Sequence, residues 1–303
     1  MTEPSLHFKQ VAIVGVGLIG GSLGMVLKQQ RVAASVVGVG RRIENLKTAV
    51  ALGAIDRYVE EPLEAVQGAD LVLLATPVDT YERHLKQWGS ALSPGTIVTD
   101  VGSVKGDLVA LAEGLLPSSV SFVGAHPIAG REKTGAAAGS VDLFCGARCI
   151  LTPTSRTSSA ALQTVRAVWE LAGSLVSEMD PHVHDRVLGA VSHLPHAVAF
   201  ALINALVEIR DRLTPELDLF AYAGGGLRDT TRIAASSPEM WRDIFLWNGD
   251  TLVGVLEVYE RQLAHLKQLI KAGDGPGIEK ELERAKQVRE RLAAPPPVRS
   301  KDS

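Results

Sequence analysis

Apolar residues recur with two different periods along this chain, and the change from one to the other falls near residue 180. Before that point, short apolar runs alternate with amphipathic stretches of helical spacing, such as residues 19–30 and 158–172. We expect strands in the runs 11–14, 35–39, 71–75, 96–99, 120–123, 148–151 and 175–178. This alternation predicts right-handed βαβ crossovers and a largely parallel sheet.

Beyond residue 180 the strand-like runs stop, and long segments of helical period follow. We expect helices over 184–209, 238–246, 249–271 and 278–292, with the breaker cluster 272–277 between the last two. Within the first, the apolar stretch 190–207 is interrupted by serine, histidine, proline and asparagine, so it predicts a buried helix rather than a membrane span.

The predicted fold class is α/β with an all-helical second half. We place a parallel-sheet domain at residues 1–180, a helical domain at 181–293 and a disordered tail at 294–303, where prolines and polar residues dominate. The late helices offer more apolar surface than a small helical domain covers, which favours a homodimer; packing within the chain is the alternative. The residues concerned include Val253, Leu256, Val258, Leu263, Leu266 and Leu269.

Composition narrows the possible partners. The 303 residues carry 31 Lys and Arg against 34 Asp and Glu, a formal net charge of −3, without the basic excess of a nucleic-acid binder or a polybasic membrane anchor. The two cysteines, Cys145 and Cys149, suffice for neither a disulfide framework nor a thiol zinc site. The first ten residues lack the apolar core of a secretory signal, so we expect a cytoplasmic protein.

A glycine motif directly follows the first predicted strand. In this G-x-G-x-x-G, Gly15 permits a tight turn, Gly17 lets the backbone of Leu18 and Ile19 approach a pyrophosphate, and Gly20 permits close helix packing. Its position at the first strand of a βαβ region predicts a Rossmann-type dinucleotide-binding domain; a merely structural glycine turn is the alternative. Thr76 and Pro77, after the run 71–75, are further cofactor-binding candidates.

The end of the second predicted strand bears on the choice of dinucleotide. An acidic residue there binds the ribose of NAD, whereas arginine accommodates the 2′-phosphate of NADP. The chain has Gly40, Arg41 and Arg42, and its first carboxylate is Glu44. NADP is therefore favoured over NAD, and exposed arginines at a helix start are the alternative interpretation.

Two polar residues follow later strands, where open α/β sheets bind ligands. Ser103 lies in the segment 100–106, and His126 lies in a segment bounded by Gly124 and Gly130. A hydroxyl beside an imidazole would suit acyl transfer, but no G-x-S-x-G elbow surrounds Ser103. Hydride chemistry with His126 as a base agrees better with the glycine motif, and a structural turn histidine remains the alternative.

Taken together, several motifs resemble the prephenate dehydrogenase family, including its cyclohexadienyl and arogenate dehydrogenases. The resemblance covers roughly residues 10–290. It rests on residues 11–24, Asp100-Val-Gly-Ser-Val-Lys-Gly106, Gly124-Ala-His-Pro-Ile-Ala-Gly130 with Glu132 and Lys133, Val191-Ser-His-Leu-Pro-His-Ala197, Gly224-Gly-Gly226 with Arg228, Asp229, Thr231 and Arg232, and Met240-Trp-Arg-Asp243.

The resemblance implies oxidative decarboxylation of prephenate to 4-hydroxyphenylpyruvate, or of arogenate to tyrosine, in tyrosine biosynthesis. It implies His126 as the catalytic base, Ser103 as the residue that orients it or the substrate hydroxyl, and Arg232 as the clamp for a substrate carboxylate. His196 and Trp241 match substrate-pocket positions, although a tryptophan on an amphipathic helix is commonly a core residue.

Four further residues have open roles. Asp229 either orients Arg232 or forms a surface ion pair, and Glu132 is a further substrate-binding candidate. His193 is interpreted as a satisfied buried polar residue; with His196 it lacks a third ligand, so no metal site is predicted. Arg131 departs from the family pattern, and its role stays open.

Two rival functions remain at this point. A dehydrogenase for a 3-hydroxy acid or an imine would share both halves without needing Ser103, His126 and Arg232 together. A non-catalytic dinucleotide sensor would keep the glycine motif and need no base.

Overall fold

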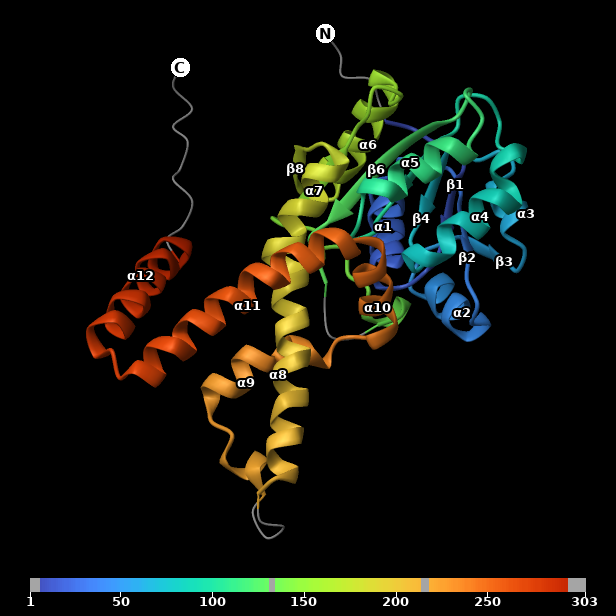
Figure 1. Ribbon diagram of the computed structural model, residues 1–303. Helices are drawn as coiled ribbons and strands as arrows, with labels where there is room; N and C mark the ends of the chain where they lie inside the picture. The colour runs from blue at the N-terminus through green and yellow to red at the C-terminus, as the bar shows by residue number, and fades with distance from the viewer. Residues whose placement is uncertain (1–5, 131–133, 214–217, 294–303) are drawn as a thin grey trace, which may run out of the picture. The chain divides into compact units, whose positions relative to one another are not determined.

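A computed structural model describes residues 6–130, 134–213 and 218–293 of the chain. The chain forms two compact units, residues 1–251 and 252–303. The first unit contains the whole sheet and the helices up to α10 (Figure 1). Glu132 and Arg131, and the predicted tail 294–303, lie outside the described residues.

The first unit is built on an eight-stranded sheet in the order β3-β2-β1-β4-β5-β6-β7-β8. All neighbouring strands are parallel except β6 and β7, which pair antiparallel. The strands are β1 (Val11–Val14), β2 (Val36–Val39), β3 (Arg57–Val59), β4 (Leu71–Leu74), β5 (Ile97–Asp100), β6 (Ser121–Pro127), β7 (Arg148–Thr152) and β8 (Leu175–Glu178). The predicted largely parallel sheet is confirmed.

The sequence pattern missed one strand, β3. It has only three residues, begins with an exposed arginine, and lies at the edge of the sheet. A short edge strand that is not buried on both faces lacks the continuous apolar run that marks the inner strands.

Helices cover both faces of the sheet, because alternate strand residues point to opposite sides. Val11 and Ile13 face the helices α1 (Leu18–Gln29), α2 (Ile43–Ala51) and α6 (Ser159–Leu171). Ala12 and Val14 face α3 (Pro62–Val66), α4 (Tyr81–Trp88) and α5 (Gly106–Leu115), and α10 (Pro238–Trp247) packs against this same core.

Beyond β8 the described residues form helices, turns and loops. The helices are α7 (Pro181–Leu188), α8 (Leu194–Asp211), α9 (Gly225–Thr231), α10, α11 (Gly249–Ala272) and α12 (Gly275–Ala293). A π-helical segment, Gly189–His193, joins α7 to α8, so the two run as one rod (Figure 1). The helix α9 was not predicted, because its seven residues begin with two glycines after a glycine N-cap and show no apolar period.

The breaker cluster separates α11 from α12 as predicted, but α12 begins three residues earlier than the apolar period does. The reason is a cap: Asp274 Oδ1 accepts a hydrogen bond of 3.0 Å from the backbone N–H of Gly277.

The prediction that residues 190–207 form a buried helix is wrong for the single chain. Ala199 is the only buried residue of α8, and Val191 is 68% exposed. By length and composition alone the helical stretch Pro181–Asp211 would also be able to cross a membrane. In the described part of the chain, α8 packs mainly against the adjoining π-helical segment, α9 and the 3₁₀ helix Arg232–Ala235, and these leave most of its apolar side chains partly or fully exposed.

Candidate active site

The glycine motif folds into the turn that its spacing predicts. Gly15 has φ +105°, and a Cβ there would lie 2.5 Å from the backbone carbon of Ala75. A Cβ on Gly20 would lie 2.3 Å from the carbonyl oxygen of Gly15, whereas one on Gly17 would meet nothing within 4 Å. Gly17 is the N-cap of α1 and leaves the first N–H groups of Leu18 and Ile19 without a side-chain cap. Open space at a helix N-terminus fits a pyrophosphate.

The loop after β4 borders this turn. The backbone of Ala75 and Thr76 lies directly against Gly15. Thr76 Oγ1 hydrogen-bonds Thr80 Oγ1 at 2.7 Å, and Thr80 in turn donates to the carbonyl of Pro77. The sequence-predicted Thr76 and Pro77 are therefore brought beside the glycine turn, at the point where the strand order reverses between β1 and β4.

Arg41 and Arg42 follow β2 and are exposed, with Arg42 at the N-cap of α2. Neither forms an ion pair with a described residue, and the nearest carboxylate in sequence, Glu44, pairs with Lys47 at 2.8 Å. The end of β2 is therefore followed by two exposed guanidinium groups, and the first carboxylate after it, Glu44, is already paired with Lys47.

His126 lies at the carboxyl end of β6 and is buried, with 8% of its surface exposed. Its Nδ1 lies 2.8 Å from Nε2 of His184, and Nδ1 of His184 lies 2.8 Å from Oδ1 of Asp185. Within the described residues the ring of His126 makes this one hydrogen bond, through Nδ1, and its Nε2 makes none. The arrangement presents one nitrogen of His126 to a ligand and ties the other into the protein.

The loop between β5 and α5 is held by a fully buried ion pair. Lys105 Nζ lies 2.6 Å from Asp100 Oδ2 and also donates to the carbonyls of Gly102 and Val104. The other oxygen of Asp100 accepts from the backbone N–H of Ala125, one residue before His126. Ser103 is therefore fixed on a loop tied to β6, and its hydroxyl makes no hydrogen bond within the described chain.

A second group of predicted residues meets around Trp241. The ring of His196 stacks on Trp241 with a centroid distance of 3.7 Å, and its Nδ1–H donates to the carbonyl of Ser192 at 2.9 Å. Burial lowers the pKa of His196, the Ser192 carbonyl opposes this, and the positive charge of Arg232 adds to the lowering. Arg232 is thus close to His196, at the start of a short 3₁₀ helix that packs on α8.

The remaining candidates differ in their surroundings. Asp229 is exposed on α9 and forms no hydrogen bond or ion pair with a described residue. His193 accepts a hydrogen bond of 3.0 Å from Asn248 at Nδ1, while its Nε2 faces the carbonyl of Ser103 without a well-aligned bond. Burial lowers the pKa of His193 to about 4, so it is neutral at neutral pH. Trp241 is buried in the core beneath α10, with its indole N–H unpartnered in the described chain.

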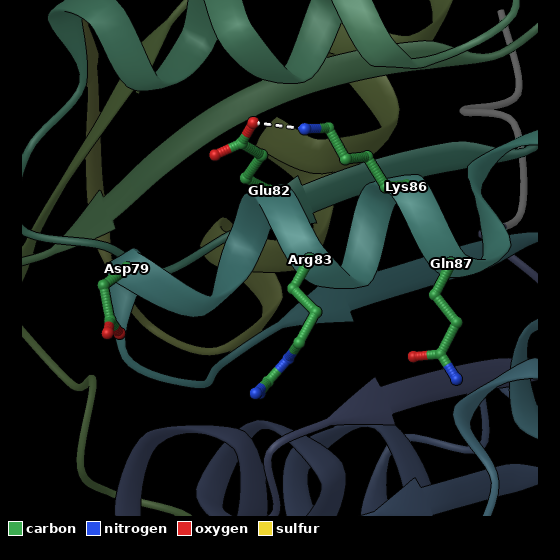
Figure 2. A pocket seen from close by; sticks show the side chains of 5 residues that line it. All are labelled: Asp79, Glu82, Arg83, Lys86 and Gln87. Carbon is green, nitrogen blue, oxygen red and sulfur yellow. Dashed lines mark hydrogen bonds and ion pairs between the residues drawn. The ribbon is translucent and has the colours of Figure 1, made fainter.

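A surface hollow of about 560 Å³ lies along α4 (Figure 2). It is lined by Asp79, Glu82, Arg83, Lys86 and Gln87, and Glu82 and Lys86 pair with each other at 2.6 Å. None of these side chains belongs to the groups around His126 or Trp241. All five lining residues are polar or charged and none is aromatic or aliphatic, which does not suit a ring-containing substrate, so the hollow is not a candidate active site.

The pattern of the sequence did not point to His184, Asp185 or Asn248 as site residues. Asn248 donates to both His193 and the backbone carbonyl of Asp185, so it joins α10 to the end of α7. The available signal was the pair His184-Asp185 within a Pro-initiated helix that directly follows a strand. Their role depends on a contact between residues 58 positions apart, which no local pattern encodes.

Comparisons with known proteins agree with this geometry. The pattern of the prephenate dehydrogenase nucleotide-binding domain matches residues 23–178, and that of the prephenate dehydrogenase dimerization domain matches residues 180–284. Prephenate dehydrogenase of Bacillus subtilis (strain 168) is 34% identical and covers 96% of this chain and 77% of its own length.

Two solved structures are similar over almost the whole chain. One is prephenate dehydrogenase from A. aeolicus in complex with hydroxyphenyl propionate and NAD+, 42% identical with a TM-score of 0.88, covering 95% of this chain and 100% of that one. The other is arogenate dehydrogenase of Synechocystis, 30% identical with a TM-score of 0.77, covering 94% and 100%. The chain therefore belongs to the prephenate dehydrogenase family.

Proposed function

We propose that the chain catalyses the oxidative decarboxylation of prephenate to 4-hydroxyphenylpyruvate, or of arogenate to tyrosine, with NAD(P)+ as the hydride acceptor. The observation that carries the proposal is His126, buried at the carboxyl edge of the sheet and bound to His184 through Nδ1 alone, in a chain of this family. The open backbone at Gly17 supports the cofactor's place on the same sheet edge.

The residues divide the reaction between them. His126 Nε2 accepts the proton of the ring hydroxyl as the C4 hydride leaves, and the bound nicotinamide supplies the hydride acceptor. The resulting ring ketone loses its C1 carboxylate as CO2, and the electrons left behind make the ring aromatic. The phenolate oxygen then takes a proton back, so His126 returns to its neutral form. Ser103 holds the hydroxyl in line with His126, and Arg232 with His196 binds a substrate carboxylate.

The test measures turnover of prephenate, of arogenate and of a panel of 3-hydroxy acids from the absorbance of the reduced nicotinamide. We expect activity with at least one of the first two and none with the panel.

His126→Asn should lower kcat by about 10²-fold or more, because a general base contributes on the order of 10² to 10⁴. His84→Asn, at a buried histidine on α4, is the control and should leave kcat unchanged. Near-full turnover of His126→Asn would remove His126 from the mechanism.

We propose further that NADP is used at least as well as NAD. The exposed Arg41 and Arg42 support this, as does the lack of a carboxylate at Gly40. Replacing both arginines by alanine should weaken kcat/KM for NADP by about ten- to a hundredfold and change NAD little. Arg83→Ala on α4 is the control. A wild-type preference for NAD that both arginines leave unaltered would contradict the proposal.

We propose also that the protein acts as a cytoplasmic homodimer. The chain carries the family's dimerization domain, and the uncovered apolar surface of α8 supports self-association through this half. The two cysteines are free, Cys145 exposed and Cys149 buried, as a reducing compartment permits.

A further inference from the structure

Three side chains form a buried line that reaches from the catalytic edge of the sheet into the helical half. His126 belongs to β6, whereas His184 and Asp185 belong to α7, and His184 is completely buried. The rings of the two histidines meet edge to face, with centroids 5.1 Å apart. The mechanism proposed above uses His126 as the base and gives no role to His184 or Asp185.

Two backbone N–H groups at the start of α5 fix the orientation of the Asp185 carboxylate. Its Oδ1 accepts from the backbone N–H of Lys105 at 2.8 Å, and its Oδ2 accepts from that of Gly106 at 2.7 Å. A Cβ on Gly106 would lie 2.9 Å from Oδ2, so glycine makes room for the carboxylate. Asp185 therefore has a single orientation, in which Oδ1 faces His184.

The donors and acceptors in this line fix every proton. Burial raises the pKa of Asp185, but the hydrogen bonds from His184, Gly106 and Lys105 outweigh it and bring the pKa below its usual value. An ionised carboxylate only accepts, so His184 must carry its proton on Nδ1. A neutral His184 then has its lone pair on Nε2, and His126 must donate to it from Nδ1. The lone pair of His126 is left on Nε2.

The surroundings keep both rings neutral before substrate binds. Burial, together with His184, Lys105 and His193, holds the pKa of His126 well below its ordinary value. Burial and Lys105 also lower the pKa of His184, against the opposing effect of Asp185 and Asp100. These groups belong to β5, the β5–α5 loop, α7 and the π-helical segment.

On the proposed function above, we propose that His184 and Asp185 are positioning residues that hold His126 in the Nδ1–H tautomer. Only this tautomer presents a lone pair to the substrate hydroxyl. When His126 accepts the proton, its Nδ1–H bond to His184 strengthens, and the carboxylate behind His184 stabilises the new positive charge. Asp185 itself stays ionised, as the buried aspartate of a Ser-His-Asp triad does.

The first test compares two substitutions of His184. His184→Phe keeps a ring in the site but removes the acceptor, and should lower kcat by about 10- to 100-fold, within the share that a general base supplies. His184→Gln places an amide oxygen near the former Nε2 and should recover most of that loss. Cofactor affinity, measured by nicotinamide fluorescence, should stay within about twofold in both.

A double-mutant cycle separates positioning from general damage. In the His126→Asn background, His184→Phe should cause no further fall in kcat, since the residue it positions is already gone. Equal fold losses in both backgrounds would show that His184 acts only on the fold, and would overturn the proposal.

The role of Asp185 is tested by removing its negative charge. Asp185→Asn should lower kcat and move the acid limb of kcat/KM to lower pH, because the imidazolium loses its counter-charge. Asp180→Asn is the matched control: Asp180 caps the same helix by accepting from His182 and Val183 and touches neither histidine. It should leave the acid limb in place. An unmoved limb in Asp185→Asn would contradict the proposal.

The tautomer of His126 is measured directly in the wild-type enzyme. ¹⁵N NMR of histidine-labelled enzyme, with His126 assigned by its loss in His126→Asn, should show a protonated Nδ1 and an unprotonated Nε2. The opposite tautomer would overturn the positioning role and leave the dehydrogenase function standing. An inactive wild-type protein would instead overturn the function, whatever the tautomer.

Discussion

His126 shows how much of a residue's chemistry comes from its neighbours. A histidine in water is about half protonated near its ordinary pKa of 6.5, which would leave a base only partly available at weakly acidic pH. Burial together with the nearby His184, Lys105 and His193 favours the neutral ring. Stabilising the base in its unprotonated form keeps it available over a wider pH range.

This lowering sets the pH dependence. The base works when unprotonated, so activity is lost as pH falls through its pKa, and a lowered pKa moves that loss to more acidic pH. We expect kcat/KM to stay level from neutral pH down to 6.5 and to fall only below it. The acid limb should disappear in the residual activity of His126→Asn. A limb centred at or above the ordinary value would mean that the ring is exposed to solvent in the working enzyme.

At the scale of elements, the sequence indicated those parts whose signal is local. Strand runs, the glycine turn after β1 and the histidine at the end of β6 are set by residues within a few positions of each other, and were predicted. His184 and Asp185 reach the site because α7 packs on α5, and Asp185 accepts hydrogen bonds from the backbone of Lys105 and Gly106. These contacts depend on tertiary packing, which no single segment encodes.

The neighbouring elements α8 and α9 show the same limit. The prediction of a buried α8 treated apolar residues as covered, although cover comes from whatever packs against them. For Asp229 the spacing left two roles open, orienting Arg232 or forming a surface ion pair, and its exposed position on α9 leaves both as predictions.

The short 3₁₀ helix that begins at Arg232 brings a guanidinium near His196. Arg232→Ala should raise KM for prephenate by about ten- to a hundredfold, as expected for loss of a charge-assisted contact, with little effect on cofactor affinity. Arg228→Ala, at an exposed arginine on the preceding α9, is the control and should leave KM unchanged. Equal weakening of cofactor and substrate would assign Arg232 to the cofactor site or to the fold.

At the scale of the whole molecule, the described helices beyond β8 carry many exposed apolar side chains. Val191 and Leu246 in the first unit, and Leu263 and Ile270 in the second, are between 55% and 74% exposed. Obligate homodimer interfaces are large and apolar, and a monomer rarely leaves such a surface in water. The family's dimerization domain spans all four residues.

The exposed apolar face of α11 is the expected site of dimer contact. Leu263 and Ile270 lie seven positions apart on one face of α11, so Leu263→Glu with Ile270→Glu should place two carboxylates where an apolar partner packs. We expect the mass in sedimentation velocity to fall from dimer to monomer, because burying an unpaired carboxylate is strongly unfavourable. Leu175→Glu is the matched control: it is 62% exposed on β8, outside the dimerization domain, and should leave the dimer intact. A double variant that stays dimeric would place the interface on another face, with α8 the next to test.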